Sequence, residues 1–112
     1  YSDISHIKIE LDYEWGNANF QKTTENIIFR VIEETVTNSL RHGHATKIWI
    51  KCTSNNYSYI LSIHNNGKSE THIKPDYGIT QMRERLTIIN GTVEFDGEKG
   101  FTTVVKFPKV GV

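Results

Sequence analysis

Apolar and polar residues alternate in five segments of this chain, which is the pattern of half-buried strands. These segments are residues 4–12, 47–52, 57–64, 92–96 and 101–107. Residues 54–56, Ser-Asn-Asn, are typical of a turn and join the second segment to the third. The pattern therefore predicts five strands, two of them in a hairpin.

Two other segments repeat at the helical period. The first follows Thr23 or Thr24, either of which can cap a helix, and runs to about His42. The second begins near Gly78 and stops at residues 90–91, an Asn-Gly pair that favours a helix end. The order is then strand, helix, two strands, helix, two strands. It predicts an α+β fold, a two-layer sandwich in which helices cover one face of a mixed sheet.

Composition narrows the class of protein. The chain has 112 residues, which suits one domain over residues 1–112, and it begins at Tyr1 rather than Met, so we expect a piece excised from a longer protein. Thirteen basic residues balance 13 acidic ones, so no net charge favours direct binding to nucleic acid or to an anionic membrane. No apolar run is long enough to span a bilayer, and a single cysteine, Cys52, excludes an intramolecular disulfide.

The first predicted helix carries the most informative polar residues. Glu34, Asn38 and His42 are one helical turn apart and form a stripe beside the apolar face. The oxygen atoms of a carboxylate and an amide suit Mg²⁺, which prefers oxygen ligands and keeps several waters. A polar helix flank joined by an ordinary hydrogen bond between residues four apart explains the same stripe, and the spacing alone favours that alternative.

Two glycine-containing segments add candidate binding residues. Asn65-Asn66-Gly67 follows the third strand, where polar side chains suit the edge of a base, although an ordinary turn explains the same residues. Gly78, at a helix start, lets backbone N–H groups approach a phosphate. Arg83, farther along that helix, is either a phosphate ligand or, as for most helical arginines, solvated or salt-bridged.

In order and spacing, these segments resemble the boxes of the GHKL ATPases, which include DNA gyrase and the histidine kinases. Residues 34–42, Glu-Thr-Val-Thr-Asn-Ser-Leu-Arg-His, resemble the N box E-A-x-x-N-x-x-[RK]-H. Residues 76–85 resemble the segment G-x-G-L-x-x-M-x-E-R, and residues 100–108 resemble the closing hairpin. The most similar branch contains the histidine kinases whose response regulators carry helix-turn-helix DNA-binding domains.

This resemblance implies an ATP site in which each residue has a role. Asn38 would be the Mg²⁺ ligand, and Glu34 would be the catalytic acid of the N box, which supports a metal-bound water or acts in phosphoryl transfer. Gly67 would turn the chain beneath the adenine. The residues implied to bind the nucleotide are Asn38, Arg41, His42, Asn65, Gly67, Gly78, Ile79 and Thr102.

Four positions depart from the family pattern. Asn65 replaces the Asp that accepts a hydrogen bond from the adenine amino group. Its carbonyl oxygen can still accept, but without charge assistance, which weakens recognition by about 1–2 kcal/mol. Ser69 and Asp76 replace glycines, and Phe101 replaces a threonine that Thr102 follows directly. These changes predict a weakened or altered nucleotide site.

The resemblance implies the ATP-binding catalytic domain of a two-component sensor histidine kinase, which transfers the γ-phosphate of Mg-ATP to a histidine on a separate dimerisation domain. ATP and Mg²⁺ are the expected cofactors, and a response regulator is the expected partner. The parent protein is expected to be a homodimer, compatible with a membrane anchor, with this domain in the cytoplasm. The isolated domain should have little kinase activity. The alternative is a non-catalytic module of the same fold, with lost or weakened ATP binding, that acts in protein interaction.

Two further hypotheses have less support. A free-standing serine kinase of the anti-sigma-factor type shares the fold, but residues 82–85 and the start at Tyr1 argue against it. A transition-metal site would need a cluster of imidazole and thiol ligands, which local spacing does not bring together. The residues available for it are His42, His44, Cys52 and His64.

Overall fold

A computed structural model describes residues 8–16, 18–41, 45–67, 77–96 and 100–109. The elements in chain order are β1 (Lys8–Tyr13), α1 (Lys22–Arg41), β2 (Lys47–Ser54), β3 (Ser58–Asn65), α2 (Tyr77–Thr87), β4 (Thr92–Asp96) and β5 (Phe101–Pro108). The order of strands and helices predicted from the sequence is confirmed, with most boundaries within about two residues. Residues 68–76, between β3 and α2, lie outside the described part of the chain.

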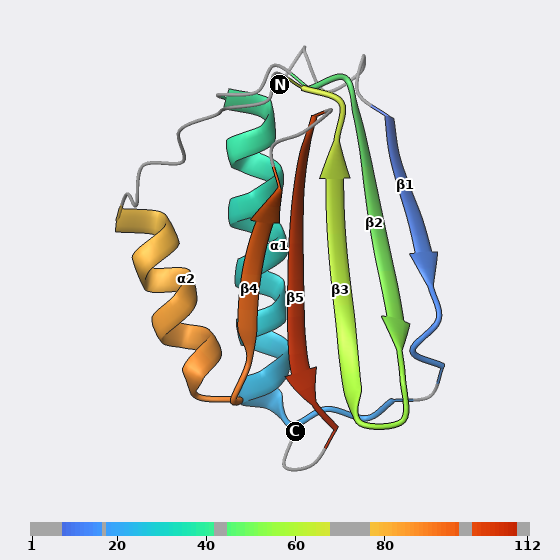
Figure 1. The fold of residues 1–112 in the computed structure, drawn as a ribbon, viewed down its shortest axis with the longest axis vertical. Helices are drawn as coiled ribbons and strands as arrows, with labels where there is room; N and C mark the ends of the chain where they lie inside the picture. Colours follow the sequence, from blue (N-terminus) through green and yellow to red (C-terminus); the bar gives the residue numbers. More distant parts are fainter. Residues whose placement is uncertain (1–7, 17, 42–44, 68–76, 97–99, 110–112) are drawn as a thin grey trace.

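The five strands form one mixed sheet in the order β1-β2-β3-β5-β4. β1 pairs with β2 in parallel, and the other neighbours are antiparallel. Figure 1 shows α1 and α2 running along the sheet, and both helices contribute side chains to one hydrophobic core with the strands. This arrangement confirms the two-layer α+β sandwich.

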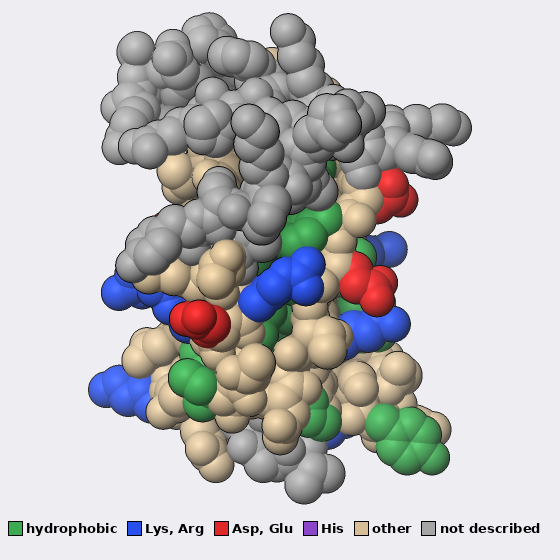
Figure 2. All heavy atoms as spheres, turned by 60° about the vertical axis from the view of Figure 1, so that its left-hand side comes forward, with side chains coloured by type: hydrophobic (Ala, Val, Ile, Leu, Met, Phe, Trp, Pro, Cys, Tyr) green, Lys and Arg blue, Asp and Glu red, His purple; other side chains and the backbone are tan. Residues whose placement is uncertain are grey.

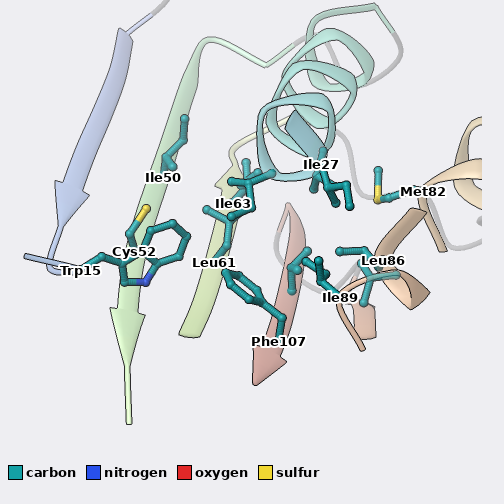
Figure 3. Close-up of a cluster of buried hydrophobic side chains, with 14 of the residues drawn as sticks. Trp15, Ile27, Ile50, Cys52, Leu61, Ile63, Met82, Leu86, Ile89 and Phe107 are labelled. Atoms are coloured by element: carbon teal, nitrogen blue, oxygen red, sulfur yellow. The ribbon is translucent and has the colours of Figure 1, made fainter. Parts of the chain in front are cut away.

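The core is built from the alternate residues of the central strands. Side chains from β2, β3 and β5 that point toward the helices are buried, and they pack against apolar residues of α1 and α2 (Figure 3). These residues include Ile27, Ile48, Ile50, Leu61, Ile63, Met82, Leu86, Val105 and Phe107. The alternation leaves the other set of strand residues on the opposite, open face of the sheet. Which face a strand residue occupies therefore decides whether it can reach the helices.

The start of α1 differs from the sequence prediction. The helix begins at Lys22, because the carbonyl of Gln21 already accepts a hydrogen bond from the backbone N–H of Glu25 at 3.0 Å. Thr24 therefore lies inside the first turn, where its side chain is buried against the core at 1% exposure. The prediction that Thr23 or Thr24 caps the helix is wrong, because burial of Thr24 determines its position more strongly than its capping tendency.

The buried stripe of α1 carries polar residues as well as apolar ones. Thr35 and Ser39 are each 5% exposed, whereas the neighbouring apolar residues Ile32 and Val36 are only partly buried. The helix is thus rotated so that small hydroxyl side chains face the sheet in its last two turns. This rotation brings α1 close to the end of β3.

The segment between β1 and α1 covers the opposite end of the sheet. Trp15, in this segment, is buried and donates a hydrogen bond from its indole Nε1–H to the Thr53 carbonyl at 2.6 Å. Its ring makes edge contacts with Phe20, Tyr59 and Phe107. This aromatic cluster closes the core at the end of the sheet that carries the β2–β3 turn.

Candidate functional site

The predicted site residues that the structure describes come from segments that meet at one end of the molecule. In Figure 1, the last turn of α1, the end of β3 and the starts of β5 and α2 lie toward the same end. Figure 2 shows the face that carries α2, where hydrophobic side chains reach the surface beside basic and acidic ones. Residues far apart in sequence, such as Ser39, Asn65 and Phe101, are therefore neighbours in the fold.

Glu34 and Asn38 lie on the flank of α1 that faces α2. They follow Ile27 along the same helical stripe, and Ile27 lies beside Met82 of α2 in the core (Figure 3). Glu34 is half-buried and Asn38 is exposed. Among the described residues, neither side chain makes a hydrogen bond or an ion pair. The structural alternative predicts a hydrogen bond between Glu34 and Asn38, and that bond is not formed. Both groups are free to bind a ligand.

Asn65 is the centre of a buried hydrogen-bond network. Its side chain is 2% exposed; its Oδ1 accepts from the backbone N–H of Gly67 at 2.8 Å, and its Nδ2 donates to Ser39 Oγ at 2.8 Å. Ser39 Oγ in turn donates to the Thr35 carbonyl at 2.8 Å. The end of β3 is thereby joined to the last turns of α1. Ser39 has no place in the candidate set drawn from the sequence, although its position one residue after Asn38 puts it on the buried side.

The neighbouring residue Asn66 holds the same strand end from the other side. Its Oδ1 accepts from the backbone N–H groups of Thr46 and Lys47, each at 3.0 Å, and its Nδ2 donates to Thr46 Oγ1 at 3.0 Å. The Asn66 side chain therefore fixes the end of β3 to the start of β2. The hydrogen bond from the Gly67 N–H to Asn65 Oδ1 makes Asn65-Asn66-Gly67 a local turn, in agreement with the simpler interpretation of this sequence. The same turn positions the Asn65 side chain.

The two threonines of β5 point to opposite faces of the sheet. Thr102 pairs with His64 and forms a 2.7 Å hydrogen bond with His64 Nδ1 on the open face. Thr103 pairs with Ile63 on the helix side and is 1% exposed. The structure therefore does not bring Thr102 together with Asn65. Sequence reasoning missed Thr103, although alternation backward from the buried Phe107 identifies it as inward-facing.

Two buried hydroxyl groups near Asn65 lack hydrogen-bond partners. Within the described part of the chain, the buried side-chain polar atoms without a partner are Thr35 Oγ1 and Thr103 Oγ1. Thr35 lies one helical turn before Ser39 on α1. In β5, Phe101 pairs with Asn65, and Thr103 is the next residue of that strand that faces the helices. A buried polar group without a partner in a folded protein calls for an explanation, such as a water or a ligand. Both groups flank the Asn65 network.

Gly100 allows the β4–β5 connection to approach this network. Its φ is +92°, a left-handed conformation, and a Cβ at this position would collide with the backbone carbonyl oxygen of Asn65. Only glycine fits here without displacing the end of β3. The sequence resemblance assigns Gly100 to the closing hairpin, and the structure gives the physical reason for a glycine at that place.

Several predicted residues cannot be placed in detail. His42, Ser69 and Asp76 lie outside the described residues. Arg41 lies within α1, and Gly78 and Ile79 lie within α2, but nothing beyond these helical positions is described for them. Their roles remain predictions.

Arg83 makes a contact within the fold, which favours a structural role over a role as a phosphate ligand. Its guanidinium lies over the ring of Phe95, 5.7 Å from the centroid, as a cation–π pair. Phe95 also stacks near Phe101, with the ring centroids 5.8 Å apart. Arg83 is thus held against β4 and is not oriented toward the Asn65 network by any described contact.

Cys52 and His64, the two candidate transition-metal ligands that the structure describes, lie on opposite faces of the sheet and cannot bind one metal ion together. Cys52 is buried on the helix side of β2, whereas His64 lies on the open face of β3, because their strand positions differ in parity. Burial, with a smaller contribution from the charge of Asp12, raises the pKa of the Cys52 thiol, so the thiol stays protonated near neutral pH. Within the described ranges, His, Cys, Asp and Glu side chains form no group of three or more suited to a metal. No helix in that part of the chain is long and apolar enough to cross a membrane.

The sequence is similar to those of curated sensor kinases. It is 28% identical over 89 residues to the sensor protein VraS of Staphylococcus aureus, a match that covers 77% of this chain and 26% of that protein. VraS of Staphylococcus saprophyticus is 34% identical over 74 residues, which covers 63% of this chain and 21% of that protein. The chain therefore spans about a quarter of the length of these relatives. No family model matches the chain.

The fold is shared with solved histidine kinases. The histidine kinase AdeS of Acinetobacter baumannii has a TM-score of 0.81 at 17% identity, covering 97% of this chain and 57% of that one. The histidine kinase domain of the blue-light activated kinase EL346 of Erythrobacter litoralis has a TM-score of 0.79 at 13% identity, covering 92% and 55%. The chain is thus similar in sequence to curated sensor kinases and shares its fold with solved histidine kinase domains.

Proposed function

We propose that this domain binds Mg-ATP and supplies the γ-phosphate that is transferred to a histidine on a separate dimerisation domain. The observation that carries the proposal is the buried Asn65 network with its two flanking hydroxyls, Thr35 and Thr103, that have no partners. Buried polar groups with unused hydrogen-bonding capacity suit the edge of a base. The relatives and structural neighbours are named as sensor proteins and histidine kinases, which favours the catalytic role over the non-catalytic module.

The adenine would be recognised by Asn65. Its Oδ1 accepts one hydrogen bond from Gly67 and retains a second lone pair, which can accept from the adenine amino group. We replace Thr102 with Thr103 in the proposed site, because Thr103 lies on the helix side of the sheet and has an unused hydroxyl. Asn65 thus replaces a charged acceptor, the carboxylate, with a neutral acceptor, the amide oxygen, so an acceptor is still present.

The phosphates and the metal ion would lie along the flank of α1. Asn38 would hold Mg²⁺ through its side-chain oxygen, and Glu34, one turn earlier, would support metal-bound water or act in phosphoryl transfer. The side chains of Glu34 and Asn38 each offer an oxygen ligand, and neither has a partner among the described residues. Such oxygen ligands suit a hard divalent cation. When bound, the ion supplies charge neutralisation at the phosphates, and the residues of this chain supply position. Arg41, His42, Gly78 and Ile79 complete the proposed set.

The remaining context comes from the relatives and from the family pattern. We propose a response regulator as the final acceptor, of the type that carries a helix-turn-helix domain, and a homodimeric parent protein with this domain in the cytoplasm. The dimerisation domain would lie elsewhere in the parent chain, because the match covers only 26% of the relative's length. The domain alone should show little phosphotransfer, and no direct contact with nucleic acid is expected.

Calorimetric titration with Mg-ATP tests the proposal. The chain should bind ATP, and EDTA should weaken the binding. Asn38→Ala should abolish the dependence on Mg²⁺. The control Asn26→Ala, which changes another exposed asparagine near the start of the same helix, should leave it intact. If the wild-type chain binds no nucleotide at millimolar concentration, the kinase assignment fails for this copy and the non-catalytic module is the better account.

A further inference from the structure

We propose that Ser39 determines base specificity by fixing the orientation of the Asn65 side-chain amide, so that the site accepts adenine and disfavours guanine. This inference rests on the proposed nucleotide site. It concerns a feature that a carboxylate at position 65 would not need. A carboxylate has two equivalent oxygens, whereas an amide has an acceptor end and a donor end.

The hydrogen bonds around Asn65 have only one favourable direction. A backbone N–H can only donate, so the Asn65 atom that faces Gly67 at 2.8 Å must be the carbonyl oxygen. The amide nitrogen then faces Ser39 Oγ at 2.8 Å. Ser39 uses its own proton toward the Thr35 carbonyl at 2.8 Å, so its oxygen is an acceptor for Asn65. Each donor in this chain of bonds meets an acceptor.

Reversing the amide would be costly because the site is buried. Asn65 is 2% exposed and Ser39 is 5% exposed, so water cannot readily replace a lost bond. In the reversed orientation, the amide nitrogen would face the N–H of Gly67, two donors in opposition, and Ser39 would have to leave the Thr35 carbonyl in order to donate to Asn65. Two hydrogen bonds would be lost, and Ser39 contributes one of them.

The orientation matters because adenine and guanine present opposite edges. Adenine offers an amino donor next to a ring-nitrogen acceptor, whereas guanine offers a carbonyl acceptor next to a ring N–H donor. After its bonds to Gly67 and Ser39, Asn65 retains one acceptor position and one N–H. An oriented asparagine amide can thus pair with adenine through both groups. The same amide turned over would match guanine. A site with Asn65 therefore needs an orienting residue, and Ser39 fills that position.

Competition titrations of ATP and GTP against the 112-residue chain test this inference. The wild type should prefer ATP, and Ser39→Ala should lower the ratio of ATP affinity to GTP affinity by about five- to tenfold, the effect of one hydrogen bond. Ser62→Ala is a matched control, because Ser62 lies on the same strand as Asn65 but on the open face of the sheet. It should leave the ratio unchanged.

The double variant separates orientation from general damage to the fold. In an Asn65→Asp background there is no amide to orient, so adding Ser39→Ala should change the ratio by less than about twofold. An equal drop in both backgrounds, or no drop in Ser39→Ala alone, would overturn the role of Ser39 while ATP binding stands. A wild-type chain that binds neither nucleotide would instead refute the proposed function, and the selectivity with it.

Discussion

Replacing Gly100 with alanine places a side chain where the backbone leaves no room for one. The φ of +92° alone costs an L-residue about 1–2 kcal/mol. The added Cβ would also collide with the carbonyl oxygen of Asn65 and lie 3.3 Å from the His64 ring. Because the main obstacle is backbone, the β4–β5 connection or the end of β3 must shift, which adds about 1–3 kcal/mol. We expect a total loss of about 2–5 kcal/mol in the free energy of unfolding.

Gly16→Ala provides the matched control for this prediction. Gly16 also has a positive φ, +62°, but a Cβ there would meet nothing within 4 Å. It should therefore cost only the conformational term, about 1 kcal/mol after the gain from a more restricted unfolded chain. Urea denaturation measures both variants, and the Gly100 variant should unfold at a urea concentration lower by about 1 M relative to the Gly16 variant. Equal midpoints for the two variants would refute the collision argument.

Three further predictions concern the core and Cys52. Leu86→Ala removes a side chain with 0% exposure between α2 and the sheet, so it should lower the free energy of unfolding by about 2–5 kcal/mol in urea melts. Trp15→Phe keeps an aromatic ring but leaves the Thr53 carbonyl without its donor, so thermal denaturation should report a loss of about 1–3 kcal/mol. The raised pKa of Cys52 means that folding disfavours its thiolate. The contribution of Cys52 to stability should therefore be constant below the ordinary thiol pKa of about 8.5 and fall as pH rises above it, and Cys52→Ala should remove this fall.

The sequence predicts elements best where burial is regular. Strands such as β2 and β5 alternate because the helices cover one face, so the periodicity and the structure have the same cause. β1 shows the limit of this argument. It alternates equally well, yet Ile9 and Leu11, on the helix side, are 53% and 64% exposed, because the described helices do not extend over this edge of the sheet. Periodicity indicates which face is apolar, but not whether anything covers it.

The site could be predicted only in part, because its residues depend on tertiary contacts that local spacing does not encode. Helical spacing predicts that Glu34 and Asn38 lie on one flank of a helix, and both lie one turn apart in α1. The same spacing gives no role to Ser39, whose partner Asn65 is 26 residues away in sequence. Hydrogen-bond partners at that separation are set by the packing of α1 on β3, which no pattern within either element reveals.

The departure at Asn65 has a different meaning once its partners are known. Taken alone, the loss of a carboxylate suggests a weaker acceptor and a degenerating site. In the structure, the amide is buried and both of its ends are hydrogen-bonded. Its orientation is determined by Gly67, two residues later in the chain, and by Ser39 of α1. A buried amide nitrogen needs an acceptor, and Ser39 supplies one by accepting from Asn65. In the proposed site, position 65 therefore keeps an acceptor for the base and gains an N–H donor beside it, which an aspartate would not offer.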